Sequence, residues 1–511
     1  MSLVPLWRSL AATLTAFSLV LGAAAARADE FPDGVRDTLG PRFEAARDGE
    51  TRIARPRHDR RLDVVRRWNR IAIDASGLDH TPVAVGENRV FGEQIGPGRS
   101  SRAIAIVQIA VFEAVNAIHG GYRSYAGVRR APLDTSLEAA VAQAAHDTLS
   151  ALFPSQRASF DQNLADQLAS LRVREARVLR GIALGRRAAL AILEMRADDG
   201  SRHPEPRMGQ DFLPSDAPGW WRQDPIGQAP LALGAHWAGV EPFVLRSADQ
   251  FRVPPPPDMT SAAYTAAFDE VKALGGDGIT TPTVRNADQT RTGTYWAYDG
   301  TPSLCAPPRL YNQIAVVIAD QQRTGPVALA RLLALANVAM ADAGIAIWES
   351  KYHYQFWRPV TGIREAAPDT GPSGGGDRNP DTVGDPTFSP LGAPASNLTG
   401  PNFTPPFPAY PSGHAGFGGA LFQMLRDFYG TDRIAFSFVS DEFNGTTLAN
   451  DGSVRPLLPR SFRALSQAEE ENGQSRIYLG IHWSFDKTEG IVQGRRIARY
   501  VFRNAFTPAG R

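Results

Sequence analysis

Apolar residues recur at helical spacing over long parts of this chain, whereas signals for strands are sparse. A stripe of side chains every three to four residues gives a helix one apolar face, and that face must pack against other helices. The predicted helices form an earlier and a later group. The earlier group covers residues 102–118, 136–153, 155–171 and 174–197, and the later group covers residues 261–274, 327–355, 414–429, 463–479 and 484–506. This pattern predicts an all-α fold made of two helical bundles packed together.

The segments between these helices indicate how the chain is divided. Residues 29–100 are rich in Arg, Asp, Pro and Gly and show little periodicity, so we expect an extended arm that wraps the surface. We assign this arm and the first bundle to residues 29–258, and the second bundle, which carries the candidate active site, to residues 259–511. Residues 368–398 and 401–411 are dense in Gly and Pro and are predicted to be loops.

The first residues of the chain have the layout of a cleavable signal peptide. Arg8 precedes an apolar stretch over residues 10–26, and Ala26-Arg27-Ala28 is a typical cleavage site. We therefore expect a signal peptide over residues 1–28 and an exported protein, periplasmic or secreted. A membrane anchor is the alternative interpretation, but the stretch is short for a bilayer span.

Composition excludes several kinds of partner and site. The chain has 54 Lys and Arg against 53 Asp and Glu, a formal net charge of +1, so no nucleic-acid partner is expected. Beyond the signal peptide no stretch has about 18 consecutive apolar residues, so we expect no membrane span in the mature protein. Cys305 is the single cysteine, which excludes an intrachain disulfide and a cysteine-based metal cage. The sequence does not specify the oligomeric state.

Two of the long predicted helices carry a similar short pattern. Residues 110–114 read Ala-Val-Phe-Glu-Ala, and residues 339–343 read Ala-Met-Ala-Asp-Ala. This internal similarity indicates either two bundles of common design or a chance match between alanine-rich helices. Both interpretations stay open from the sequence.

Three separated clusters in the last third of the chain combine cations, histidines and a Ser-Gly turn. They are Lys351 with Arg358, then Ser412-Gly413-His414, and finally Arg476 with His482. Guanidinium groups and the free N–H groups of a helix N-terminus both favour an oxyanion. A break near Gly480 lets the last pair reach one pocket, and Asp486 is placed to orient the His482 ring. The clusters together predict an oxyanion pocket.

Each cluster taken alone also has an ordinary structural interpretation. Lys351 and Arg358 lie near the predicted end of a helix, where cations commonly cap the carbonyl groups. The residue before Pro359 is pushed out of the helical region, so that helix should stop near residue 357. Ser412 fits a helix N-cap, and a lone buried histidine is more often a packed core residue than a ligand.

The ordered set of motifs resembles a known superfamily. Lys-x6-Arg-Pro, Pro-Ser-Gly-His and Ser-Arg-x5-His resemble the signature that unites vanadium-dependent haloperoxidases, type 2 phosphatidic acid phosphatases and bacterial acid phosphatases. The likeness extends further with the fungal vanadium chloroperoxidase type, over about residues 265–486. It includes residues 295–300 (YWAYDG), 307–314 (PPRLYNQI) and 405–410 (PPFPAY).

This resemblance implies a fold, a cofactor and a reaction. The cofactor would be vanadate, and the enzyme would oxidise bromide, with chloride as a further candidate, using hydrogen peroxide to give hypohalous acid. The organic acceptor is not specified. By the same resemblance His482 would bond vanadium, His414 would act as acid or base, Asp299 would pair with Arg476, and Trp348 and Phe407 would line the halide side. The residues that would hold the vanadate oxygens are Lys351, Arg358, Ser412, Gly413 and Arg476.

Two alternative functions use the same pocket. An exported acid phosphatase would form a phosphohistidine on His482, with His414 as general acid. A non-catalytic oxyanion-binding protein would need only the cations and the Ser-Gly turn. Three features favour the haloperoxidase. They are the extended likeness around residues 295–314, the additional helical group, and Phe407, at a position where bromoperoxidases generally have a histidine. The segment between His414 and Ser475 is shorter than in the fungal type, which leaves the shape of the entrance open.

Overall fold

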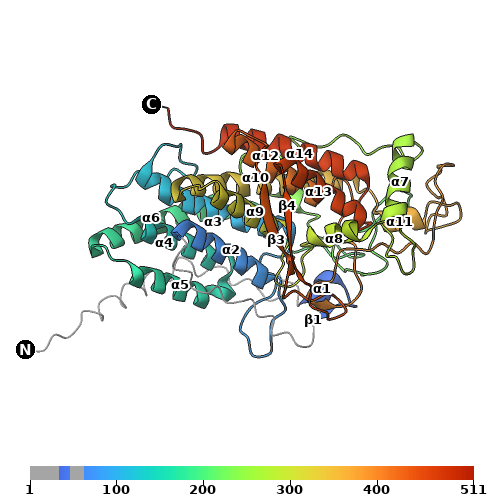
Figure 1. Cartoon of the computed structure of the whole chain (residues 1–511), viewed down its shortest axis with the longest axis horizontal. Helices are drawn as coiled ribbons and strands as arrows, with labels where there is room; N and C mark the ends of the chain where they lie inside the picture. Colours follow the sequence, from blue (N-terminus) through green and yellow to red (C-terminus); the bar gives the residue numbers. More distant parts are fainter. Residues whose placement is uncertain (1–33, 46–62, 511) are drawn as a thin grey trace, which may run out of the picture.

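The computed structural model describes residues 34–45 and 63–510, and helices dominate it (Figure 1). The predicted signal peptide over residues 1–28 lies outside the described residues. The first half of the chain contributes α1 (Val35–Leu39), α2 (Val64–Asp79), α3 (Gly96–His119), α4 (Leu137–Leu152), α5 (Arg157–Ser170) and α6 (Glu175–Met195). Two short 3-10 turns, η3 (Pro154–Gln156) and η4 (Trp237–Gly239), follow α4 and α6.

The second half contributes a further set of helices and two small antiparallel sheets. The helices are α7 (Ala262–Leu274), α8 (Ala287–Tyr295), α9 (Pro307–Gln321), α10 (Pro326–Tyr354), α11 (Pro359–Arg364), α12 (Gly413–Tyr429), α13 (Leu465–Tyr478) and α14 (Ser484–Asn504). Strand β1 (Glu44–Ala45) pairs with β2 (Leu398–Thr399), and β3 (Phe436–Asn444) pairs with β4 (Leu457–Phe462). The prediction of a mainly helical fold is confirmed.

One hydrophobic cluster runs through both groups of helices, with α3 and α10 at its centre. Within the described residues these two helices are the ones long and apolar enough to cross a membrane. Their most apolar windows are 94% and 100% buried inside the protein, as in core helices. Helices α3 and α10 lie side by side (Figure 1), and their buried apolar residues pack the two bundles together.

Glycines bring α12 and α14 close together beneath the candidate site. A Cβ atom on Gly494 would lie 2.0 Å from the Gly416 carbonyl oxygen, and one on Gly419 would lie 2.6 Å from the Ile491 carbonyl oxygen. Larger side chains would push the helices apart at both points. The two helices are also linked at their N-terminal ends, where the Ser412 N–H donates to the Asp486 carbonyl oxygen at 3.0 Å.

Residues 64–79 form helix α2, so the prediction of an extended arm was wrong there. Asp63 caps the helix by accepting the N–H groups of Val65 and Arg66, each at 3.0 Å. Val65, Trp68 and Ala72 recur at helical spacing and are buried in the common core. The arginines between these residues lie on the other face of the helix and masked its periodicity in the sequence.

Other elements also differ from the sequence interpretation. Helices α8, α9 and α11 and the hairpin β3–β4 were not predicted. The alternation in Phe436-Ser-Phe-Val is the strand signal, because every second residue of this stretch is buried. Helix α10 ends at Tyr354, one residue before the end of the predicted range 327–355 and short of the stop near residue 357 expected from Pro359, because Gln355 adopts a left-handed conformation and donates its N–H to the Lys351 carbonyl oxygen.

The similar sequence patterns in α3 and α10 each supply a buried carboxylate with the same structural role. Glu113 in α3 accepts the backbone N–H groups of Tyr125 and Ala126 and the hydroxyl of Ser124. Asp342 in α10 likewise accepts three backbone N–H groups, those of residues 243–245. Each buried carboxylate fastens a loop to the middle of a core helix, which favours the interpretation of two bundles with a common design.

We expect Asp342 to make stability depend on pH. Burial raises its pKa to about 6, so the folded state holds a proton that the unfolded chain releases near pH 4. Stability therefore falls as pH rises from about 4 to about 6, by up to about 3 kcal/mol from this group. Denaturant unfolding of the wild type and of Asp342→Asn, at about pH 4 and at about pH 6, measures this change in the free energy of unfolding. A stability difference between them that does not change with pH would contradict the expectation.

Candidate active site

The three predicted clusters meet at one cavity, which the ends of several helices surround. The cavity has about 340 Å³ of free space, part of which is open to solvent. Predicted residues among its lining are Asp299, Trp348, Phe407, Gly413, His414, Arg476 and His482. Lys351, Arg358 and Ser412 are fully buried and are not among the residues that line the cavity.

His482 is held in one orientation between the Asp486 carboxylate and the Arg358 guanidinium group. Its Nδ1 atom donates to Asp486 Oδ2 at 2.8 Å, so the neutral ring carries its proton on Nδ1. The lone pair is then on Nε2, which accepts a hydrogen bond from Arg358 Nη1 at 2.9 Å. Burial, together with the charges of Arg358 and Lys351, lowers the pKa of His482 well below its ordinary value. The neutral ring can therefore offer Nε2 as a ligand or nucleophile.

Asp486 is held at the start of α14. Its Oδ2 atom also accepts the Trp483 N–H at 2.9 Å, and burial raises the pKa of its carboxyl group to about 7. Because this carboxyl is fixed by the backbone, it sets the position of the His482 ring. The sequence prediction of this pairing agrees with the geometry.

Lys351 and Arg358 are two buried cations, and both lie over the ring of Phe407, which lines the cavity. Lys351 Nζ donates to the carbonyl oxygens of Pro408 at 2.6 Å and Ala409 at 2.9 Å, which leaves one of its three donors. Arg358 Nε donates to the Phe407 carbonyl oxygen at 2.9 Å, while its buried Nη2 has no acceptor. Burial lowers the pKa of Arg358 to about 9 and that of Lys351 well below its ordinary value. An anion in the cavity would offset the cost of burying these charges.

Arg476 and Asp299 form a buried ion pair in the lining of the cavity. Arg476 Nη2 donates to Asp299 Oδ1 at 2.6 Å, as the resemblance implied. The Nε and Nη1 atoms of the same guanidinium are buried and have no acceptor. Unpartnered buried donors are costly, so these two atoms indicate a missing acceptor. An oxyanion in the cavity would supply it.

His414 faces the cavity from the first turn of α12. Its Nε2 atom donates to the Ala297 carbonyl oxygen and lies 3.9 Å from Asp299 Oδ1. Burial, and next the charge of Arg476, lowers its pKa well below the ordinary value. Because Nε2 carries the proton of the neutral ring, Nδ1 is the atom left to exchange a proton.

Ser412 and Gly413 open helix α12. The Ser412 hydroxyl accepts the Ala415 N–H at 3.4 Å and so acts as the N-cap. A Cβ atom on Gly413 would lie 3.5 Å from the Trp348 ring, an ordinary van der Waals distance, so the indole packs directly against this position. The ring centroids of Trp348 and Phe407 are 4.9 Å apart. Phe407 also lies under both cations, with Lys351 Nζ 5.1 Å from its centroid.

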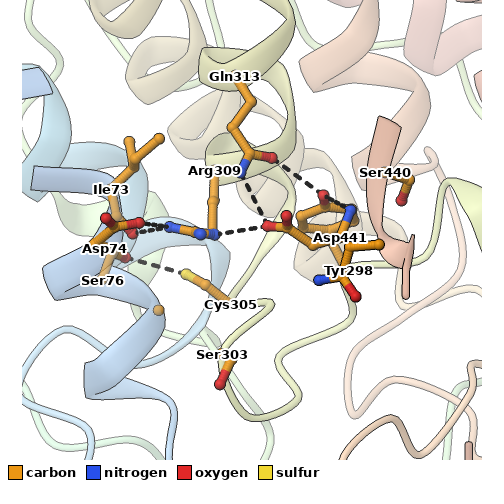
Figure 2. Close-up of polar contacts among 12 residues, drawn as sticks. Ile73, Asp74, Ser76, Tyr298, Ser303, Cys305, Arg309, Gln313, Ser440 and Asp441 are labelled. Atoms are coloured by element: carbon orange, nitrogen blue, oxygen red, sulfur yellow. Dashed lines mark hydrogen bonds and ion pairs between the residues drawn. The ribbon is translucent and has the colours of Figure 1, made fainter. Parts of the chain in front are cut away.

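A polar network next to Asp299 fixes the loop that carries it. The Tyr298 hydroxyl donates to Gln313 Oε1 at 3.1 Å and accepts the Asp441 N–H at 2.6 Å. Figure 2 shows Arg309 between Asp74 of α2 and Asp441 of β3, at 3.0 Å and 3.2 Å. Elements from both halves of the chain thus hold Tyr298, and Asp299 follows it directly.

Some cavity residues were not predicted from the sequence. They are Pro97, Pro307, Pro405 and Phe417. Pro97 and Pro307 are in the first turns of α3 and α9, and a proline at the start of a helix was the signal available for them. Pro97 shows that the first bundle contributes to the wall of the cavity.

Comparison with known proteins agrees with this geometry. Residues 331–509 match the family model of the VCPO second helical-bundle domain. Vanadium chloroperoxidase of Curvularia inaequalis is 40% identical over 275 residues. The resemblance to the vanadium haloperoxidases is confirmed. The match covers 47% of this chain and 43% of the fungal protein, so it spans less than half of that relative.

Solved structures extend the likeness to the vanadium-haloperoxidase fold as a whole. A bacterial vanadium-dependent iodoperoxidase has a TM-score of 0.68 at 23% identity, covering 88% of this chain and 99% of its own. A bacterial vanadium-dependent chloroperoxidase has a TM-score of 0.60 at 17% identity, covering 81% and 95%. These likenesses concern the fold. None of these relatives favours the acid phosphatase alternative.

Proposed function

We propose that this chain is a vanadium-dependent haloperoxidase that oxidises halide with hydrogen peroxide to hypohalous acid. The observation that carries the proposal is the set of unpartnered donors around His482 Nε2. Arg358 Nη2 and Arg476 Nε and Nη1 are buried without acceptors, and Lys351 Nζ has one donor left beside them. Bromide is the proposed halide, with chloride as a further candidate because Phe407 keeps one wall of the cavity apolar.

The residues present fit vanadate as the cofactor. Vanadate is an oxyanion shaped like phosphate, and guanidinium and ammonium donors suit its oxygens. His482 Nε2 would hold the vanadium atom, and Arg358, Arg476 and Lys351 would hold the oxygens. Ser412 and the Gly413 N–H would complete the cradle at the N-terminus of α12. When bound, vanadate supplies Lewis-acid activation of hydrogen peroxide towards attack by halide.

The protein groups have distinct tasks in this proposal. Asp486 keeps the proton of His482 on Nδ1, so that Nε2 stays available. Asp299 orients Arg476, and His414 exchanges a proton at Nδ1 beside the cofactor. Trp348 and Phe407 exclude water from one side of the cavity, which strengthens the electrostatic interactions inside it. Oxidation of halide by peroxide consumes a proton, which gives His414 its use as an acid.

Paired assays on metal-free protein test the proposal. We expect vanadate with peroxide to start bromination of a dye, and we expect little hydrolysis of an aryl phosphate. Hydrolysis that vanadate inhibits, without bromination, would instead support the phosphatase. Vanadate binding without either activity, unchanged in His414→Ala, would support the non-catalytic oxyanion-binding protein.

We expect Asp486→Asn to weaken vanadate binding by about 10- to 100-fold, the usual cost of losing a partner that orients a metal ligand. The asparagine keeps the size of the side chain but no longer holds the His482 proton on Nδ1 by charge. Equilibrium dialysis of vanadate measures the effect. Unchanged affinity in this variant would show that Asp486 does not orient the ligand.

We also propose that the protein is exported after cleavage behind Ala28. The tripartite pattern of residues 1–28 supports this proposal. Mass spectrometry of the protein recovered from the producing cells and their medium tests it. A mature N-terminus at Met1 in the cytoplasm would contradict it.

A further inference from the structure

A second cavity adjoins the candidate active site at the start of α3. It shares Pro97 and Trp348 with the first cavity and has about 200 Å³ of free space. Much of this space is open to solvent, and the enclosed part has room for about one water-sized molecule. The dimensions therefore suit a small ion or a solvent-sized molecule.

The N-terminus of α3 is directed at this cavity. Helix α3 has 24 residues, no side-chain cap and no acidic residue in its first turn. Gly96, Pro97, Gly98 and Arg99 of that turn all line the cavity. The Gly96 N–H donates to His80 Nε2 and Pro97 has no N–H, but the Gly98 N–H has no acceptor within the helix. The helix dipole adds positive potential here.

Trp237 supplies an independent indication of a ligand. Its side chain lines the second cavity and is 1% exposed, yet its Nε1–H has no acceptor. Gly98 lets this indole lie against the helix, because a Cβ atom there would be 2.9 Å from Nε1. A buried indole N–H beside a helix N-terminus lacks one hydrogen-bond acceptor.

The charged side chains of the cavity do not oppose an anion. Glu205 is the carboxylate in the lining, and its Oε1 accepts Arg99 Nε at 3.1 Å. Its Oε2 accepts the Gly234 N–H. Arg99 Nη1 and Nη2 donate to the carbonyl oxygens of Ser201 and His203. The carboxylate is thus paired on both oxygens, and the helix N-terminus and the indole supply donors without an acceptor.

From this arrangement we propose that the second cavity binds one halide ion and supplies it to the first cavity. The ion accepts the Trp237 Nε1–H and lies at the N-terminus of α3, with Trp348 and Pro97 as the wall that separates it from the oxyanion site. Use of the ion in turnover rests on the proposed haloperoxidase function. Binding of the ion rests only on the donors that line the second cavity.

Bromide in crystals of the full chain grown without vanadate provides the direct test. We expect an anomalous peak within hydrogen-bond distance of Trp237 Nε1, lost in Trp237→Phe, which keeps an aromatic ring but not the donor. Trp68→Phe is the matched control, because Trp68 is also fully buried with an unpartnered Nε1 but lines neither cavity. The control variant should keep the peak.

Kinetics test the supply of halide to the first cavity. We expect the KM for bromide to rise about tenfold in Trp237→Phe, as for the loss of one hydrogen bond to a charged group. The kcat, the KM for peroxide and the affinity for vanadate should stay as in the wild type. No bromide peak, a peak that persists in Trp237→Phe, or an unchanged KM for bromide would overturn the proposal. A wild type without halogenation would refute the proposed function, and the bromide peak would still decide the anion site.

Discussion

The His482→Ala variant should lose halogenation activity by at least about a thousandfold in kcat/KM and should no longer retain vanadate. The expected loss exceeds the 10- to 100-fold usual for partners that only orient a ligand, because His482 would itself bond the vanadium atom. The Nε2 atom is the ring nitrogen that carries the lone pair, because Nδ1 donates to Asp486, and it lies against the Arg358 guanidinium at 2.9 Å. Equilibrium dialysis of vanadate and steady-state bromination measure both effects.

His146→Ala provides a control for this loss. His146 is a largely buried histidine of α4 whose ring nitrogens bond Asp147 and Asp161, each at 2.7 Å. Its removal should leave vanadate binding unchanged. A thermal unfolding midpoint of His482→Ala near that of the wild type would show that the loss is local. Normal bromination by His482→Ala would refute the assignment of this residue.

We expect Arg476→Ala to weaken vanadate binding by about 10²- to 10⁴-fold. The substitution removes two unpartnered buried donors, and each hydrogen bond to a charged group contributes about 1.5–3 kcal/mol. It also leaves Asp299 as a buried carboxylate without its cation, which adds repulsion towards the anion. Vanadate titration followed by vanadium NMR measures the affinity.

Two further variants separate charge from geometry. Arg476→Lys keeps the charge but loses the planar fork, so its affinity should fall between those of the wild type and Arg476→Ala. Arg102→Ala removes another buried arginine, which pairs with Asp199 at 2.6 Å in the first bundle. That variant should be less stable yet bind vanadate normally. Equal affinities of Arg476→Ala and the wild type would show that Arg476 does not hold the cofactor.

Sequence reasoning was most accurate where a pattern is local. The N-cap at Ser412 and the pairing of His482 with Asp486 follow from residues that are close together in the chain. Helix α2 also had local signals, an Asp63 cap and apolar residues at helical spacing, but an arginine-rich composition was given more weight. The missed strand β3 likewise carried its alternation in the sequence.

Contacts between distant segments could not be predicted in this way. Pro97 and Trp237 of the first half lie next to Trp348 in the two cavities, and nothing near them in the chain indicates this. The anchoring of Tyr298 by Gln313 and Asp441 also joins segments that only the folded core brings together. Such contacts depend on how helix faces pack, which a single sequence does not specify.

The amino-acid sequence by itself determined the helical class of this protein and the chemistry of its oxyanion donors, because helical periodicity and side-chain type are properties of short segments. Only the tertiary structure decided which donors remain without acceptors and where the second cavity lies. The physical reason is that burial and hydrogen-bond satisfaction depend on every segment packed around a group. Arg358 Nη2 and Trp237 Nε1 lack acceptors because of neighbours that are far away in the chain.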